Sequence, residues 1–131
     1  MVTESAEQTM AFAKEYAKSL KKGDVVLLRG EMGAGKTVFV KGLAQGLGIE
    51  DEITSPTYAY MNDYDGKLYH YDCYRLKDGA QGEALGICDY FYADGICVIE
   101  WPQNIEDVLP QNCKVVEIRK LDANKREILC E

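Results

Sequence analysis

The sequence lacks the long apolar runs that mark membrane and secreted proteins. No stretch approaches the roughly 18 apolar residues that a membrane-spanning helix needs. A signal peptide is also absent from the N-terminus, because Glu4 and Glu7 stand where a basic start and an apolar segment would be. We therefore expect a cytoplasmic protein that does not bind a membrane.

Paired cysteines and histidines are scarce. None of the five cysteines belongs to a C-x-x-C pair, so a zinc site is not expected. An odd number of cysteines without a secretion signal is typical of free thiols that pack as small apolar residues. A nucleophilic cysteine would need a histidine partner, and the chain has a single histidine, His70. The cysteines are Cys73, Cys88, Cys97, Cys113 and Cys130.

Positive charge is in deficit. The 15 Lys and Arg residues are outnumbered by 22 Asp and Glu residues, which gives a net charge of −7. Proteins that hold a nucleic-acid backbone usually present a basic surface, so this chain is not expected to bind nucleic acid alone. A length of 131 residues suits one domain, and a hydrophobic content of 47% is enough to build its core.

Hydrophobic periodicity predicts alternating helices and strands. Ser5 and Gln8 resemble a capping box, and apolar residues at helical spacing behind them predict a helix that ends near Gly23. Residues 25–28 and 96–99 are short continuous apolar runs, which are typical of strands buried on both faces. The other predicted elements are a helix over 36–47, strands over 58–64 and 67–74 joined by an Asp65-Gly66 turn, one or two helical turns over 80–86, and a closing hairpin of strands 115–118 and 127–130.

The strongest motif is the segment GEMGAGKTVF, residues 30–39. It contains G-x-x-x-x-G-K-T directly after a predicted strand and at the start of a predicted helix, which is the setting of a phosphate-binding loop. Glycines let backbone N–H groups turn toward phosphate oxygens, and the helix N-terminus adds unpaired N–H groups. Lys36 can reach the β- and γ-phosphates, and the Thr37 hydroxyl can ligate Mg²⁺. A glycine-rich turn with an incidental lysine is the less favoured alternative.

Together these features predict an α/β fold. The expected architecture is a three-layer sandwich of the P-loop NTPase type, with a mixed central sheet and flanking helices.

Hydrolysis would also require carboxylates near the metal and the attacking water. Glu100 ends the second apolar strand, where many P-loop proteins place a metal-binding carboxylate; the alternative is a strand-end charge that meets solvent. Asp72, in the segment YHYDCYR, could orient or deprotonate water, and the spacing equally allows a polar residue on the outer face of a hairpin.

Two short motifs of GTP-binding proteins also occur. Residues 63–66 read D-x-x-G, but they coincide with the predicted hairpin turn. Residues 124–127 read N-K-x-E, which ends in glutamate where the guanine-binding motif has aspartate. GTP specificity is therefore not expected.

Four motifs follow one another along the chain: GEMGAGKT (30–37), SPTY (55–58), YHYDCYRL (69–76) and VIEWP (98–102). In this order they resemble the TsaE (YjeE) family, small bacterial ATPases of tRNA threonylcarbamoyladenosine biosynthesis. The resemblance extends over nearly the whole chain, and the later three segments are more specific than the phosphate loop alone. It implies a single P-loop ATPase domain over residues 1–131 that binds ATP with Mg²⁺ and hydrolyses it slowly. It also implies a complex with the TsaB and TsaD proteins, through which tRNA is met only indirectly.

The resemblance further implies roles for individual residues. Thr37 and Glu100 would hold Mg²⁺, and Lys36 would act in catalysis at the phosphates. Thr57 would sense the γ-phosphate, and Asp72 would activate water. The residues expected to bind the nucleotide are Thr9, Met32, Gly33, Ala34, Gly35, Lys36, Thr37, Trp101, Gln103 and Arg126.

Two other functions fit the same loop. A small-molecule or nucleotide kinase would need a lid that carries several arginines, whereas after the loop this chain has only Arg75, Arg119 and Arg126, widely separated. A nucleotide sensor without useful hydrolysis would have no need of Asp72 as a base.

Overall fold

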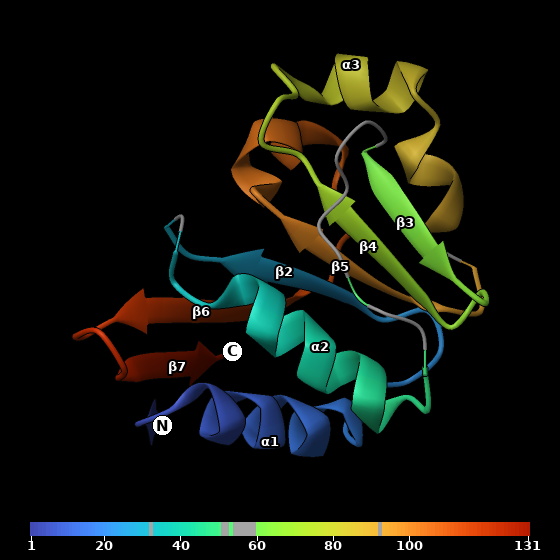
Figure 1. Cartoon of the computed structure of the whole chain (residues 1–131). Helices are drawn as coiled ribbons and strands as arrows, with labels where there is room; N and C mark the ends of the chain where they lie inside the picture. The colour runs from blue at the N-terminus through green and yellow to red at the C-terminus, as the bar shows by residue number, and fades with distance from the viewer. Residues whose placement is uncertain (32, 51–52, 54–59, 92) are drawn as a thin grey trace.

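The computed structural model describes residues 1–31, 33–50, 53, 60–91 and 93–131. Within these residues the strands form one seven-stranded sheet in the order β1-β7-β6-β2-β5-β4-β3 (Figure 1). Strands β6, β2, β5 and β4 are parallel neighbours, whereas β1–β7, β7–β6 and β4–β3 pair antiparallel. The elements are β1 (Val2–Thr3), α1 (Ala6–Ala17), β2 (Val25–Arg29), α2 (Lys36–Gly46), β3 (Met61–Tyr64), β4 (Leu68–Asp72), α3 (Gly79–Ala84), η1 (Ile87–Tyr90), β5 (Ile96–Glu100), η2 (Pro102–Val108), β6 (Lys114–Lys120) and β7 (Arg126–Cys130), where η marks a 3₁₀-helix.

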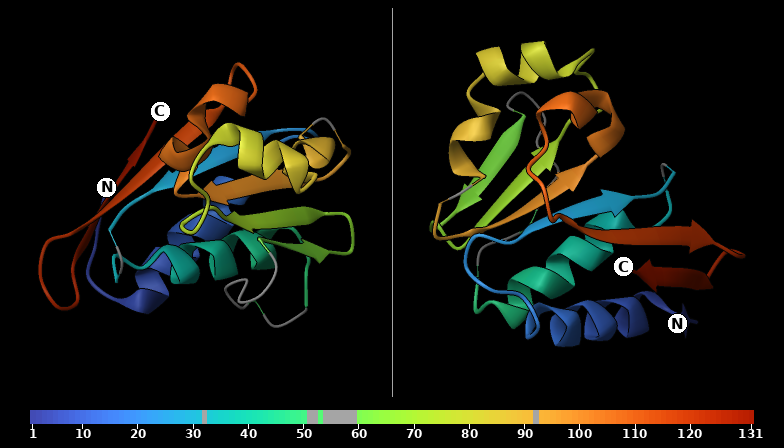
Figure 2. Two further views of the ribbon diagram at one scale, coloured as in Figure 1. Left: turned by 90° about the horizontal axis from the view of Figure 1, so that it is seen from above. Right: turned by 180° about the vertical axis from the view of Figure 1, so that it is seen from behind.

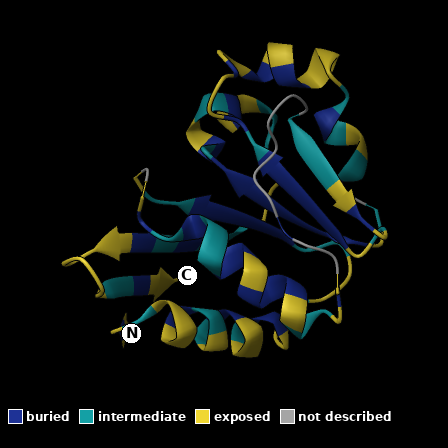
Figure 3. Cartoon of the chain, viewed as in Figure 1, coloured by how far each residue is buried: buried dark blue, intermediate teal, exposed yellow. Residues whose placement is uncertain are grey.

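Helices cover both faces of the sheet, which confirms the predicted three-layer α/β architecture. Figure 2 shows α1 and α2 on one face, and α3 with the two 3₁₀-helices on the other. Successive residues of a strand point to opposite faces, so β2 contributes to two cores. Val26 and Leu28 pack beneath α1 and α2, and Val25 and Leu27 pack on the opposite side. The central strands are accordingly buried along their length (Figure 3).

Helices α1 and α2 pack closely because small residues face each other. A Cβ added to Gly46 would lie 2.6 Å from the Ala17 Cβ, and one added to Gly42 would lie 2.6 Å from the Ala13 Cβ. Gly42 and Gly46 are four residues apart in α2, and Ala13 and Ala17 are four residues apart in α1, so each helix presents its two small residues on one side. This close approach fixes the position of α2 and therefore of its N-terminus.

The predicted end of the first helix near Gly23 is wrong, because α1 ends at Ala17. The chain tightens after the helix into three-residue turns, in which Ser19 N donates to Tyr16 O at 3.0 Å. The Ser19 hydroxyl also donates to Tyr16 O at 2.7 Å. Short polar side chains of this kind compete with helical hydrogen bonds for backbone groups. The spacing of apolar residues carries no information about that competition, so it did not predict where the helix ends.

The remaining elements follow the sequence closely. The Asp65-Gly66 turn is confirmed, since both residues have positive φ, at 57° and 66°, between the paired strands β3 and β4. Strand β3 is described from Met61, and residues 58–59 of the predicted strand lie outside the described residues. The sequence did not reveal β1, η1 or η2. All five cysteines lie in the described part of the chain and are free.

No helix in the described ranges combines the length and the apolar character that crossing a membrane requires.

Candidate functional site

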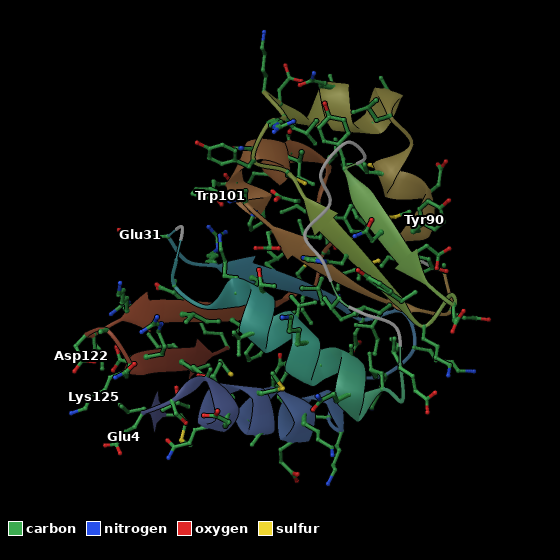
Figure 4. The ribbon with its side chains drawn as sticks, viewed as in Figure 1. Glu4, Glu31, Tyr90, Trp101, Asp122 and Lys125 are labelled. Atoms are coloured by element: carbon green, nitrogen blue, oxygen red, sulfur yellow. The ribbon has the colours of Figure 1, made fainter. Side chains whose placement is uncertain are left out.

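The candidate site lies at the carboxyl ends of the parallel strands β2, β5 and β4. The pairing register places Leu28 of β2 opposite Glu100 of β5, and Glu100 opposite Asp72 of β4. The glycine-rich loop leaves β2 at this same edge and leads into α2. In Figure 4, Glu31 and Trp101 mark this end of the sheet. Ligands of open α/β sheets bind at the carboxyl ends of the strands, so the site has the expected location.

The loop enters α2 through a backbone conformation that favours glycine. Gly35 precedes the helix with φ at 98°, in the left-handed region. The helix has no side-chain cap and no acidic residue in its first turn. Its N-terminal N–H groups and the positive end of its dipole therefore form a potential anion-binding end.

Arg126 of β7 holds the loop from outside. Its Nε donates to Ala34 O at 2.9 Å, and its Nη2 donates to Gly33 O at 3.4 Å. Its Nη1 also donates to Asp122 O at 2.9 Å, which ties the guanidinium to the β6–β7 turn. The structure thus places Arg126 beside the loop as a brace on its carbonyl groups.

Lys36 is buried at the start of α2, with 7% of its side chain exposed. Its Nζ lies 3.8 Å from Glu100 Oε1 and 4.3 Å from the centroid of the Trp101 ring. Burial lowers the pKa of Lys36, and the nearby carboxylates of Glu100 and Asp72 oppose that shift. The ammonium therefore sits where opposite charge and an aromatic face attract it.

Trp101 turns the chain sharply after β5. Its φ of 57° and ψ of 49° lie in the left-handed region, which bulky residues rarely adopt. The turn directs the ring over Lys36, and the ring also contacts Tyr74 at a centroid distance of 5.0 Å. Such strain is typical of residues held in place for function.

Glu100 is buried at the end of β5, so the alternative of a charge that meets solvent is wrong. One carboxylate oxygen faces Lys36, and the other lies 2.5 Å from Nε2 of His70. His70 itself is fully buried on β4. A buried carboxylate with two such neighbours is positioned by contacts on both of its oxygens.

Asp72 ends β4 level with Glu100 and is half-buried. Its Oδ1 accepts a hydrogen bond from Tyr74 N at 3.0 Å. Burial lowers the pKa of Lys36, and Asp72 lies close enough for its negative charge to oppose that lowering. Asp72 pairs with Glu100 in the strand register, so it lies at the same edge of the sheet as the glycine-rich loop.

The model of the family "Threonylcarbamoyl adenosine biosynthesis protein TsaE" matches residues 3–128. The chain belongs to the TsaE family. It is 44% identical over 129 residues to the TsaE protein of Bacillus subtilis, a match that covers 96% of this chain and 80% of the relative. It is 42% identical to the TsaE protein of Treponema pallidum, covering 97% of this chain and 96% of the relative.

A solved structure agrees with this assignment. The crystal structure of Bacillus subtilis YdiB has a TM-score of 0.79 and 39% identity to this chain. The match covers 99% of this chain and 82% of YdiB. The fold predicted from the TsaE resemblance is therefore confirmed at this level of similarity.

Six of the residues expected to bind nucleotide line two hollows beside the loop. The larger one, about 430 Å³, is lined by Ala34, Trp101 and Gln103 together with Arg29 and Glu31. The smaller one, about 110 Å³, is lined by residues of α1, the start of α2 and the β6–β7 turn. These residues are Ser5, Ala6, Thr9, Gly35, Val38, Ala123, Asn124 and Arg126.

The structure thus brings most of the predicted TsaE site together. Thr37 lies in the first turn of α2, next to Lys36. Thr9 is buried, and its Oγ1 lies 2.6 Å from the Thr3 Oγ1. Met32 and Thr57 lie outside the described residues, so their predicted roles stay predictions.

Sequence reasoning missed three features of the site. These are the His70–Glu100 contact, the left-handed turn at Trp101 and the bonds from Arg126 to the loop. One of these features had a signal in the sequence. His70 lies between Tyr69 and Tyr71 in a strand that is buried on both faces. A polar residue in such a strand needs a buried partner.

Proposed function

We propose that the chain binds ATP with Mg²⁺ at the N-terminus of α2 and hydrolyses the ATP slowly. The observation that carries this proposal is the placement of Lys36. A buried ammonium in the first turn of a helix without a capping side chain lies 3.8 Å from a buried carboxylate. Phosphate oxygens would pair with the ammonium and with N–H groups at a helix start whose N-cap residue, Gly35, has no side chain to cap them.

The residues present fit a magnesium ion. Glu100 supplies a buried carboxylate, and Thr37 supplies a hydroxyl from the turn of α2 that also carries Lys36. Hard oxygen ligands together with phosphate oxygens are the usual environment of Mg²⁺ in nucleotide sites. When bound, the ion neutralises charge on the β- and γ-phosphates.

The side chains would divide the reaction between them. The N–H groups of residues 33–37 and the Lys36 ammonium hold the phosphates and balance the charge that develops on the γ-phosphoryl group. Asp72 accepts the proton of the attacking water, whose oxygen bonds to the γ-phosphorus as the bond to the bridging oxygen of ADP breaks. The Tyr74 N–H fixes the orientation of the Asp72 carboxylate at this edge. Thr57 would sense the γ-phosphate.

The proposal extends to the pathway named for the relatives. The Bacillus subtilis and Treponema pallidum proteins are tRNA threonylcarbamoyladenosine biosynthesis proteins. We place this chain in the same pathway as a cytoplasmic partner of the TsaB and TsaD proteins, so that it meets tRNA only through their complex. The net charge of −7 supports an indirect contact with tRNA.

An ATPase assay with and without the TsaB–TsaD pair tests this function. We expect weak turnover by the chain alone and clear stimulation by the pair. Thin-layer analysis of γ-labelled ATP identifies the product in the same reactions. Free phosphate supports an ATPase, whereas a labelled small molecule would mean a kinase. Equal turnover with and without the pair would remove the partnership from the proposal.

Substitution of Asp72 tests its assignment as the base. Asp72→Ala should lower partner-stimulated turnover by about 100-fold or more, since general bases contribute about 10² to 10⁴ in rate, and should leave ATP binding in place. Asp94→Ala is the matched control, because Asp94 is exposed in the turn that precedes β5. Unchanged turnover in Asp72→Ala would favour a nucleotide sensor over an ATPase that uses this base.

A further inference from the structure

His70 is a fully buried histidine with one of its two ring nitrogens left without a partner. Nε2 lies 2.5 Å from Glu100 Oε2. Nδ1 has no hydrogen-bond partner, and it is the one buried side-chain nitrogen or oxygen of this kind in the described ranges. Buried polar atoms without partners are rare, so this histidine needs an explanation.

The missing partner identifies the tautomer. A buried N–H without an acceptor and a buried lone pair without a donor both cost free energy, but of the two neutral tautomers only the Nε2–H form lets His70 donate to the carboxylate. The Nδ1–H form would leave a donor unpaired and set two acceptors, Nε2 and Oε2, against each other. Of the two neutral tautomers, the geometry therefore favours the one with its proton on Nε2, which donates to Glu100.

The contact decides which way the Glu100 carboxylate faces. Oε2 is taken by His70, and Oε1 lies toward Lys36 Nζ at 3.8 Å. Without the histidine, Oε2 would lose its bond in a buried position, and the carboxylate could turn both oxygens to the Lys36 ammonium. That arrangement would withdraw Lys36 from the phosphates and Glu100 from the metal.

We infer that His70 is a positioning residue that holds Glu100 in the orientation required for magnesium. The inference rests on the proposed function, because it gives Glu100 the role of magnesium ligand. Ligating carboxylates are commonly held by outer hydrogen bonds, and removing such a bond typically weakens metal affinity or activity about 10- to 100-fold. His70 touches neither ATP nor water in this account and acts through Glu100.

Nitrogen NMR of the wild-type protein gives the first test. The chain has a single histidine, so its imidazole signals can be assigned without ambiguity. Long-range ¹H–¹⁵N correlation should show Nε2 protonated and Nδ1 bare. A protonated Nδ1 with a bare Nε2 would overturn the inference, because that ring could not donate to Glu100.

Metal coupling in variants gives the second test. The probe is the non-hydrolysable analogue β,γ-imido-ATP, and the readout is the ratio of its affinity in Mg²⁺ to its affinity in EDTA. We expect His70→Leu to lower this ratio about tenfold or more, with little change in EDTA. His70→Gln, whose amide N–H can replace the Nε2 donor, should recover most of the ratio.

Leu68→Val is the matched control for a core lesion. Leu68 is fully buried two residues before His70, on the same strand face. The control should destabilise the protein and leave the ratio at its wild-type value. An unchanged ratio in folded His70→Leu, or an equal fall in Leu68→Val, would overturn the positioning role.

The two proposals fail in different ways. Wild-type protein that does not bind the analogue in Mg²⁺ would overturn the proposed function and this inference with it. Wild-type protein that binds it, beside a His70→Leu variant with wild-type coupling, would overturn the inference alone. If His70→Leu does not fold, the NMR result and the affinity ratio of His70→Gln decide. A fall in the affinity ratio of His70→Gln as large as the fall in Glu100→Gln would contradict the donor role of His70.

Discussion

Helices α1 and α2 lie side by side but begin in opposite ways. Helix α1 starts behind Ser5, which has an extended backbone and whose Oγ accepts a hydrogen bond from Gln8 N at 3.1 Å, and the helix has Glu7 in its first turn. Both features are standard means of stabilising a helix N-terminus. Helix α2 starts behind Gly35 without a side-chain cap, and its first turn holds Lys36 instead of an acid.

The difference shows what each helix start is for. A positive side chain at the positive end of a helix dipole is unfavourable for stability. Where a protein breaks a local rule of this kind, the position is often a functional site. In α1 the Ser5 side chain caps the start of the helix, whereas the start of α2 has no side-chain cap and is where we propose that an anion binds, with Arg126 holding the loop in place.

The largest expected effect comes from the lysine of α2. Lys36→Met should weaken ATP binding by about 100-fold, since hydrogen bonds to charged groups contribute roughly 1.5–3 kcal/mol each. Calorimetric titration with ATP measures the affinity. A variant that binds ATP normally would contradict the contrast between the helices.

Giving α2 an ordinary N-cap residue is the next test. Gly35→Ser supplies a good capping side chain, yet it should destabilise the protein by about 1–2 kcal/mol, because a left-handed backbone is costly for residues with a Cβ. The Cβ itself would lie 3.5 Å from Arg126 Nε, so the strain comes from the φ of 98° rather than from a clash. Urea denaturation measures the change. A stabilised Gly35→Ser variant would mean that α2 lacks only a cap.

Removal of the α1 cap should have a smaller effect. Ser5→Ala should lower the free energy of unfolding by about 1 kcal/mol, and Ser5→Thr, which keeps a hydroxyl, should recover most of it. Thermal or urea denaturation of the three proteins makes the comparison. Equal stability of the wild type and Ser5→Ala would show that the capping bond at α1 contributes nothing.

The smallest expected effect is a pH dependence that Lys36 confers. Its folded pKa is lowered from 10.5, so in the window between the folded pKa and 10.5 the unfolded chain binds more protons than the folded one. The free energy of unfolding attributable to Lys36 therefore rises with pH through that window and is lost as pH falls through the folded pKa. Groups such as Tyr16, whose pKa is raised to about 12 by burial, titrate in both proteins and cancel in the difference. The free energy of unfolding of the wild type should rise relative to that of Lys36→Met as pH rises from the folded pKa of Lys36 to 10.5, and a constant difference would contradict this.

Much of the fold could be predicted because its signals are local. Strand β2 was found from a continuous apolar run, and α2 from the motif that opens it. The end of α1 could not be predicted, because apolar residues continue at helical spacing beyond Ala17 while the Ser19 hydroxyl bonds to Tyr16 O after the helix has ended. The 3₁₀-helix that begins at Pro102 was missed, because Trp101 before it adopts a left-handed conformation that a bulky residue rarely takes.

The site was predictable where motif and strand order coincide. Glu100 and Asp72 meet because parallel strands bring their carboxyl ends to one edge. The His70–Glu100 and Arg126–loop contacts join residues far apart in the chain, and nothing local in the sequence reports such distances. The roles of Met32 and Thr57 stay predictions.

The most direct test of the account is an amide NMR titration with Mg-ATP. If the backbone of the loop wraps the phosphates, the amide signals of Gly33, Gly35 and Lys36 should show the largest shifts in the protein, and Lys36→Met should reduce them strongly. Saturation without shifts at these amides, or no response to Mg-ATP at all, would contradict the claim that α2 is left uncapped in order to hold a nucleotide.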